Sequence, residues 1–489
     1  MVFLESTSYI LSKTAFLKLE QCEKAYYFYR KMPYLRDKVD TDKQLTFLRG
    51  HSVGFKAREL FPDGLEGFQD GMTVEEAVIN TRKLVDSGTS VIYEAAFIHN
   101  QVLVITDMLV KENGKYIGYE VKSSLKVSET YLKDACLQYY VMNHCLAAFE
   151  DMFLVTIHPD YRASPHANVR DLFKKRSVKE KALENYAFFA FKVDAAKQLL
   201  EKGIVPDRPT GLHCFRPYQC DYFGTCWKND LSEKSVFHLP LIDKGILLEW
   251  FHSGWKTFDQ VPNEVISKPI HKRIKEALTT NEVVLDKVNL KQWIAKLEGY
   301  TAAFDIEVWA PAIPELEGTR PFEQIPFLIS IYNENGTFSY LADYVTDDRK
   351  MMASYICEKL AHYDTLLVYD KTLEVSVLNQ LANLFPECRD DLKAIESKIV
   401  DVFDVVINGW YYHPKLLNNF SLKKLSSLIS EEQYTDVTSG LEAMHLFTEY
   451  RSQENAIEKE MLRERLVHYC ELDAQATFGI TRYFQTLIK

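Results

Sequence analysis

Runs of apolar residues divide the 489-residue chain into two strand-rich regions with helical sequence around them. In the first region, four short runs rich in Val, Ile and Tyr have the composition of β-strands: residues 90–98, 101–110, 115–124 and 151–158. Longer stretches that read as helical precede and follow these runs: residues 1–50, 52–64, 75–87, 129–148 and 176–202. This order predicts a sheet flanked by helices.

A second strand–helix region begins near residue 296 and ends in a long helical stretch at the C-terminus. The run "AAFDIEVWA" (302–310) opens it, and Asn335-Gly336 predicts a hairpin turn in the next apolar stretch. Mixed helical sequence separates the two regions. We therefore predict an α/β protein in three parts: residues 1–230, a helical connector at 231–295, and residues 296–489.

The dipeptide Asn113-Gly114 predicts a two-residue type I′ turn between the second and third strand candidates. Glu112 then faces Lys115, and the same register places Asp107 opposite Glu120, with Cβ atoms about 4.5–5.5 Å apart. Opposed carboxylates destabilise a sheet, and a divalent cation would offset that repulsion. The alternative is an exposed hairpin in which Glu120 forms a surface ion pair.

Lys122 lies two residues after Glu120 and therefore on the same face of the strand. A lysine beside a Mg²⁺ or Mn²⁺ site suits phosphodiester hydrolysis, because it can stabilise the charge of the transition state or orient the attacking water.

Asp107 followed by Glu120-Val121-Lys122 resembles the PD-(D/E)XK nuclease signature. Glu94 fits a further metal-site acid, and Gln138 resembles the glutamine motif of RecB-like nucleases, although Met142 stands where that motif has a tyrosine. The resemblance implies a restriction-endonuclease-like mixed sheet. It also implies Mg²⁺ or Mn²⁺ on Glu94, Asp107 and Glu120, with Lys122 and Gln138 in catalysis.

Four cysteines bracket this region: Cys22, Cys214, Cys220 and Cys226. One early and three late cysteines resemble the iron–sulfur RecB-like exonucleases, and the resemblance implies a [4Fe-4S] cluster on these four thiolates. Zinc is an alternative, although both late gaps hold five residues where zinc sites have two to four. Four unrelated reduced cysteines are a further alternative.

Asp305 and Glu307 form a second pair of acids on one strand face, separated by Ile306. Acids within an apolar strand are costly unless they are paired or bind a metal. The stretch resembles the first motif of DEDD exonucleases. That resemblance implies a ribonuclease-H-like α/β domain with a two-metal mechanism.

Two later stretches resemble the remaining DEDD motifs. "YDKTLE" places Glu374 where the family has an aspartate, and "HYCELD" places Asp473 on the last helix. Tyr469 precedes Asp473 by four residues and shares its helix face, whereas His468 fits the histidine form of the motif. Mg²⁺ or Mn²⁺ would bind Asp305, Glu307, Glu374 and Asp473. Asp401 and Lys423 are further candidates.

The net charge of −11 argues against a protein that holds nucleic acid by overall positive charge, but metal-site carboxylates leave a nuclease open. The N-terminal stretch lacks an apolar signal segment and no run reaches the length of a membrane span, so we expect a cytoplasmic protein without membrane contact.

The whole chain resembles a bacterial family of unknown function that joins an iron–sulfur RecB-like domain to a DEDD-type domain. This resemblance implies a metal-dependent nuclease acting on nucleic-acid ends, in DNA repair or phage defence. DNA is favoured as its partner, and RNA is possible. Three alternatives remain: a single active site, a non-enzymatic nucleic-acid-binding scaffold with vestigial sites, and a zinc-stabilised RNA-processing factor.

Overall fold

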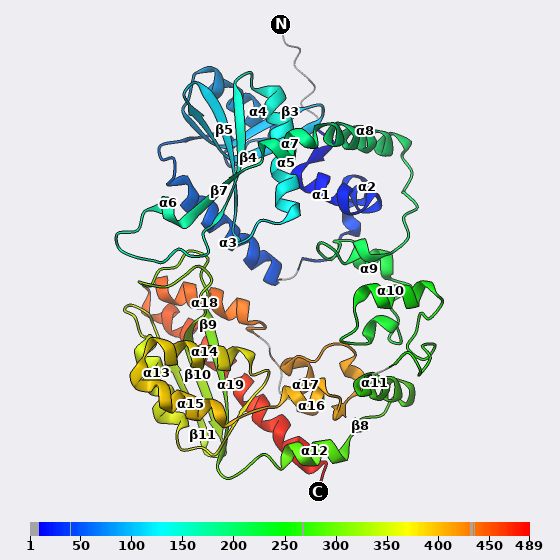
Figure 1. The fold of residues 1–489 in the computed structure, drawn as a ribbon, viewed down its shortest axis with the longest axis vertical. Helices are drawn as coiled ribbons and strands as arrows, with labels where there is room; N and C mark the ends of the chain where they lie inside the picture. Colours follow the sequence, from blue (N-terminus) through cyan, green and yellow to red (C-terminus); the bar gives the residue numbers. More distant parts are fainter. Residues whose placement is uncertain (1–8, 40, 267, 431–433, 435) are drawn as a thin grey trace. The chain divides into compact units, whose positions relative to one another are not determined.

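The computed structural model describes residues 9–39, 41–266, 268–430, 434 and 436–489. The chain divides into two compact units (Figure 1). Unit 1 contains Met1–Lys228 and Pro311–Phe322, and unit 2 contains Asn229–Ala310 and Glu323–Lys489. This division groups the predicted connector with unit 2, and it assigns a twelve-residue part of the predicted second domain to unit 1.

Unit 1 is built on a seven-stranded mixed sheet with the order β2-β3-β4-β5-β6-β7, and β1 pairs with β4. The strand bounds are β1 Leu11–Ser12, β2 Leu65–Glu66, β3 Val91–His99, β4 Val102–Glu112, β5 Lys115–Lys122, β6 Phe149–Ile157 and β7 Phe173–Ser177. Strand β4 is antiparallel to both β3 and β5, whereas β5 and β6 are parallel.

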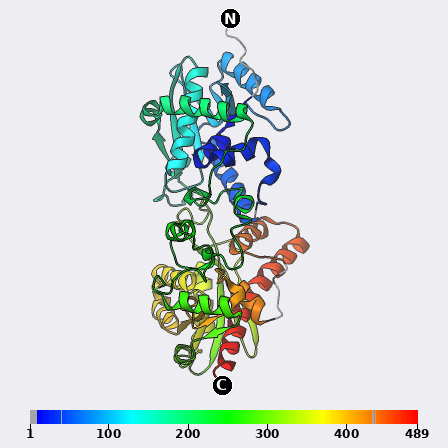
Figure 2. The same ribbon diagram turned by 90° about the vertical axis from the view of Figure 1, so that its right-hand side faces the viewer.

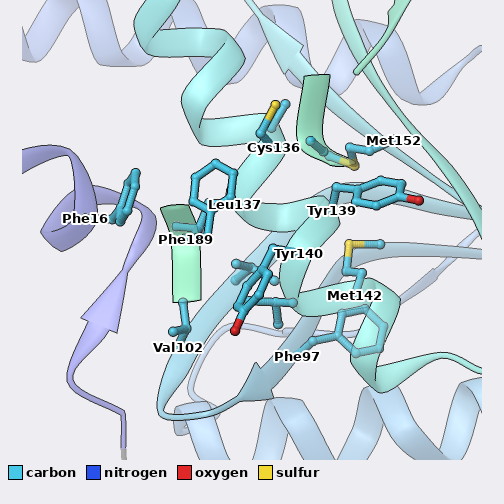
Figure 3. Packing of buried hydrophobic residues seen from close by; sticks show 14 of the residues in the cluster. Phe16, Phe97, Val102, Cys136, Leu137, Tyr139, Tyr140, Met142, Met152 and Phe189 are labelled. Carbon is cyan, nitrogen blue, oxygen red and sulfur yellow. The ribbon is translucent and has the colours of Figure 1, made fainter. Parts of the chain in front are cut away.

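Helices cover both faces of this sheet. Their bounds are α1 Lys13–Gln21, α2 Glu23–Lys31, α3 Thr41–Arg58, α4 Val74–Asp86, α5 Glu129–Cys145, α6 Val169–Leu172, α7 Lys179–Glu184, α8 Tyr186–Lys202 and α9 Phe223–Trp227, with 3₁₀ turns at Pro33–Leu35 and Leu212–Cys214. Leu137 and Tyr140 of α5 pack against Val102 of β4, Phe16 of α1 and Phe189 of α8 (Figure 3). Helix α3 contributes to a separate apolar cluster that includes side chains of β3, β4 and β5.

Unit 2 is built on a five-stranded sheet with the order β11-β10-β9-β12-β13. The strand bounds are β9 Thr301–Trp309, β10 Ile325–Asn333, β11 Gly336–Leu341, β12 Thr365–Val368 and β13 Ile399–Asp401, and a separate pair is formed by β8 Val284–Leu285 and β14 Tyr411–Tyr412. Strand β10 is antiparallel to β9 and β11, whereas β9, β12 and β13 are parallel. The hairpin loop holds Glu334 and Asn335, because Asn333 already pairs with Gly336.

The helices of unit 2 are α10 Lys244–His252, α11 Pro269–Thr280, α12 Lys287–Ile294, α13 Arg349–Leu360, α14 Thr372–Leu384, α15 Arg389–Ser397, α16 Phe403–Ile407, α17 Leu422–Ile429, α18 Gly440–Ser452 and α19 Ala456–Thr486, with 3₁₀ turns at Val236–His238, Pro386–Cys388 and Pro414–Leu416. The long helix α19, red in Figure 1 and Figure 2, packs along β9 and β10. Mixed sheets flanked by helices in both units confirm the predicted α/β class.

Among the residues that the structure describes, no helix combines the length and the apolar character needed to cross a membrane.

Candidate active sites

The β4–β5 hairpin has the predicted register. Asn113 and Gly114 form its loop with positive φ angles of 50° and 80°, and pairs run from Glu112–Lys115 to Met108–Tyr119. The ladder ends at that last pair, so the predicted cross-strand pairing of Asp107 with Glu120 is not part of it. Instead, Asp107 Oδ2 accepts a hydrogen bond of 2.6 Å from the backbone N–H of Val121.

Strand β1 pairs with β4 at Val102 and Leu103, beyond the end of the β4–β5 ladder. Lys13 follows β1 directly as the first residue of α1. Its ammonium donates to Ile105 O at 2.8 Å and to both carboxylate oxygens of Glu120, at 3.0 and 3.1 Å. The N-terminal segment therefore supplies a cation to the predicted metal site.

Lys122 binds two acids. Its Nζ lies 2.7 Å from Glu120 Oε1 and 2.6 Å from Asp134 Oδ2. Only 19 % of the Lys122 side chain is exposed, so the alternative of an exposed surface ion pair does not describe it. Asp134 lies one turn before Gln138 on α5, and Gln138 Nε2 donates to Asp134 Oδ1 at 3.3 Å. Gln138 is buried, and within the described ranges its Oε1 has no hydrogen-bond partner.

Glu94 lies between the pairs Tyr93–Met108 and Ala95–Thr106, so it stands opposite Asp107 in the sheet. Its φ of 48° is in the left-handed region, which is uncommon for a residue with a side chain and is often found at functional sites. Arg58 of α3 lies 3.4 Å from the Glu94 carboxylate. Each predicted metal-binding acid of unit 1 thus contacts a protein cation or a backbone N–H.

The two central acids of this cluster, Asp107 and Glu120, have pKa values shifted in opposite directions. Burial raises the pKa of Asp107 to about 7, with a further contribution from the charge of Glu120. Burial also disfavours the charge of Glu120, but the ammonium groups of Lys122 and Lys13 outweigh it and lower its pKa to about 2. Glu120 is therefore an anion neutralised by the protein's own lysines.

The four predicted cluster cysteines line one cavity: Cys22, Cys214, Cys220 and Cys226. Cys22 lies between α1 and α2, Cys214 ends the 3₁₀ turn Leu212–Cys214, Cys220 lies in the loop that follows, and Cys226 lies in α9. Gln21 ties these segments together, because its Nε2 donates to the carbonyls of His213 (2.8 Å) and Tyr218 (2.7 Å). Burial raises the pKa of Cys220 to about 11, and the neighbouring thiols add to this effect.

In unit 2, three acids predicted to bind metal come together. Asp305 and Glu307 of β9 and Asp473 of α19 place one carboxylate oxygen each within 4.8 Å of one another. Among the residues that the structure describes, this is the one group of three potential ligands at such a distance. Burial and the charge of Asp473 raise the pKa of Asp305 to about 8, and burial likewise raises the pKa of Glu307 and Asp473.

Glu374 lies in the first turn of α14 and is 4 % exposed. Its Oε2 is buried and has no hydrogen-bond partner among the described residues, and burial together with the charge of Asp305 raises its pKa. The turn that precedes α14 has Asp370 at a φ of 61°. Asp401 holds this turn, since its carboxylate accepts hydrogen bonds from the N–H groups of Asp370, Lys371 and Phe403 at 2.9–3.1 Å.

Two tyrosines and a lysine surround Asp473. Tyr434 donates to Asp473 Oδ1 at 2.5 Å. Lys423 donates to the Tyr469 hydroxyl at 2.9 Å, and its ammonium lies 4.3 Å from the centre of the Tyr469 ring. Tyr469 is buried beside the acids, whereas His468 is exposed. The structure thus brings Tyr469 and Lys423 to the second cluster and leaves His468 outside it.

Four contributors to the two clusters were missed in the sequence: Lys13, Arg58, Asp134 and Tyr434. Asp134 carries a usable signal, because it precedes Gln138 by four residues on one helix. Tyr434 and the two cations reach their partners from segments distant in sequence, and no local pattern marks them.

The raised pKa values predict an unusual pH dependence. The folded protein keeps a proton on Asp305 up to about pH 8, whereas the unfolded chain releases it near pH 3.8. Between these values the folded state binds more protons, so the free energy of unfolding of the metal-free protein falls as the pH rises. Comparing wild type with Asp305→Asn in chelator isolates this effect, which should be on the order of a few kcal/mol.

Urea unfolding at pH 5, 6.5, 8 and 9 measures the difference in the free energy of unfolding between wild type and Asp305→Asn. The stability of wild type relative to Asp305→Asn should decrease through this range and level off above pH 8. A constant difference would show that Asp305 is not protonated in the fold.

Asp401 should matter for stability as well as for the second cluster. Asp401→Ala leaves three backbone N–H groups without their acceptor, and we expect a loss of about 2–4 kcal/mol. Asp390→Ala, at an exposed acid of α15, is the control and should change stability by less than about 0.5 kcal/mol. Denaturant unfolding followed by circular dichroism tests this. Equal effects of the two substitutions would exclude the anchoring role.

Comparison with known proteins adds one match. Residues 302–421 match the model of a family described as a domain of unknown function (DUF2779). The matched range contains Asp305, Glu307, Glu374 and Asp401, and it ends before Asp473. No curated protein matches the chain. The family description names no activity.

Proposed function

We propose that the protein is a metal-dependent nuclease whose best-formed centre is the second acid cluster. The observation that carries this proposal is the convergence of Asp305, Glu307 and Asp473 within 4.8 Å. A fourth acid, Glu374, has a buried oxygen for which the described part of the chain offers no hydrogen-bond partner. Four carboxylates whose pKa values are raised together are stabilised by a hard divalent cation such as Mg²⁺ or Mn²⁺.

The donor set fits such an ion, because carboxylate oxygens are its preferred ligands. A bound cation would supply an activated water and stabilise the leaving oxygen of a phosphodiester. Tyr469 orients the attacking water through its hydroxyl, and Lys423 holds that hydroxyl by a hydrogen bond of 2.9 Å. The ammonium of Lys423 also supplies positive charge beside the scissile phosphate. These roles describe a 3′–5′ exonuclease by resemblance to the DEDD enzymes.

The first cluster is proposed as a second, PD-(D/E)XK-type DNA exonuclease site. Lys122 and Gln138 lie beside Glu120 and Asp134, in agreement with a catalytic role. One observation favours the alternative in which only the second site is active: both oxygens of Glu120 are already bound by ammonium groups. DNA ends are the proposed substrate, in repair or phage defence.

The four cysteines are proposed to hold a [4Fe-4S] cluster. A tetrahedral zinc site with Zn–S bonds of about 2.3 Å places its sulfur atoms about 3.8 Å apart. In the part of the chain that the structure describes, no three of these thiols lie within 4.8 Å of one another, although all four line one cavity. Four thiols around one cavity match the ligand set of a [4Fe-4S] cluster.

Nuclease activity should depend on Asp305. On end-labelled single-stranded DNA, duplex DNA and RNA with Mg²⁺ or Mn²⁺, we expect Asp305→Asn to lower the rate from the second site by about 100-fold or more. The comparison includes Lys122→Ala, which disables the first site, and the exposed α19 control Glu460→Gln. If cleavage persists unchanged in the Asp305→Asn, Lys122→Ala double variant, neither cluster is a nuclease site.

Anaerobically purified protein should be brown, with absorbance on the order of 400 nm and about four iron atoms per chain. Cys220→Ser should lose colour and iron, whereas Cys357→Ser, outside the four-cysteine cavity, should retain both. Iron and zinc analysis with electron paramagnetic resonance after reduction measures this. Colourless protein with one zinc ion per chain would replace the iron–sulfur assignment by zinc.

A further inference from the structure

The position of Lys13 is fixed by backbone structure on both sides. Leu11 and Ser12 pair in parallel with Val102 and Leu103 of β4. Ser12 then caps α1, accepting a hydrogen bond of 3.2 Å from the N–H of Ala15. Lys13 is thereby held beside the point where the β4–β5 ladder ends. The approach of its side chain to the first acid cluster is a consequence of the fold.

The ammonium of Lys13 has three oxygen partners, one on β4 and two on Glu120. Glu120 is 3 % exposed at its side chain, whereas Lys13 is 26 % exposed. Burial opposes the charge of Lys13, but the charges of Glu120, Asp134 and Asp107 outweigh this and raise its pKa. Lys13 is therefore a permanent cation that reaches the buried carboxylate from the solvent side.

The two acid clusters differ in how their charge is neutralised. In unit 2, three carboxylates approach within 4.8 Å, and one Glu374 oxygen has no hydrogen-bond partner in the part of the chain that the structure describes. In unit 1, both oxygens of Glu120 accept from Lys13, and one of them also accepts from Lys122. A carboxylate bound in this way has to exchange a partner before it can bind a metal ion.

We propose that Lys13 is an internal counter-ion that competes with a divalent cation for Glu120 and thereby sets the cation affinity of the first site. The inference deepens the proposed function and rests on the part of it that assigns a Mg²⁺ or Mn²⁺ site to this cluster. Withdrawal of the Lys13 side chain towards solvent frees Glu120 Oε2, while Lys122 remains paired with Glu120 Oε1 and with Asp134. Lys13 acts through Glu120 and is a positioning residue.

The test is a Mn²⁺ titration of the full-length protein, followed by electron paramagnetic resonance of free Mn²⁺. Asp305→Asn and Asp473→Asn are present throughout, so that the second cluster does not contribute. Adding Lys13→Gln, which removes the competing charge, should tighten Mn²⁺ binding by about tenfold or more. Lys13→Arg retains a cation and should keep the weak binding. Glu120→Gln should abolish the gain made by Lys13→Gln.

Lys133→Gln is the matched control. Lys133 forms its ion pair, 2.8 Å long, with Glu20 and not with an acid of the cluster. It should leave Mn²⁺ affinity unchanged. In chelator, Lys13→Gln should unfold at a lower temperature than the control. Added Mn²⁺ should raise the unfolding temperature of Lys13→Gln and remove this difference. Folding of each variant is thereby measured in the same experiment.

Unchanged or weaker Mn²⁺ binding by Lys13→Gln would overturn the proposal, and so would an equal gain with Lys13→Arg. These outcomes do not depend on cleavage. If Lys13→Gln does not tighten Mn²⁺ binding but the first site still cleaves, only the role of Lys13 is refuted. If Lys13→Gln tightens Mn²⁺ binding but the first site does not cleave, only the nuclease assignment of the first cluster is refuted.

Discussion

Carboxylates buried in the sheets and in the helices packed on them are the constraint on which both units depend. Removing an ionised carboxylate from water costs several kcal/mol unless a cation or hydrogen-bond donors replace the lost hydration. Glu120, Glu307 and Glu374 are all nearly inaccessible to solvent. Each sheet therefore has to place compensating groups around its acids, and many of the unusual features near these acids do so.

The two units meet this requirement differently. Unit 1 surrounds its acids with Lys13, Lys122 and Arg58, and the charges of Lys122 and Lys13 lower the pKa of Glu120 to about 2. Unit 2 leaves the carboxylates close together with raised pKa values, and Lys423, whose own pKa is lowered by burial, is the cation near them. The first arrangement is stable without an added ion. In the second arrangement the raised pKa values let bound protons relieve the repulsion between the carboxylates, and a divalent ion would displace those protons.

The sequence predicted the local parts of these sites and missed the distant ones for identifiable reasons. Asn113-Gly114 fixes the hairpin register because only a tight turn with two positive φ angles joins the strands. Helical spacing places Tyr469 with Asp473 and leaves His468 exposed. Strand alternation cannot reveal that the β4–β5 ladder ends before Asp107. There the Asp107 carboxylate accepts a hydrogen bond from the backbone N–H of Val121.

The contribution of Lys13 shows why the chemistry of a site is harder to predict than its acids. An acid in an apolar strand is conspicuous, because it breaks the local pattern. A lysine at a helix start is an ordinary residue in sequence, and only the pairing of β1 with β4 brings it to Glu120, 107 positions away. Two clusters of buried acids can therefore differ in the protein cations that the fold places beside them. In this protein two lysines bind the central carboxylate of the first cluster, whereas the acids of the second cluster keep raised pKa values although Lys423 lies near them.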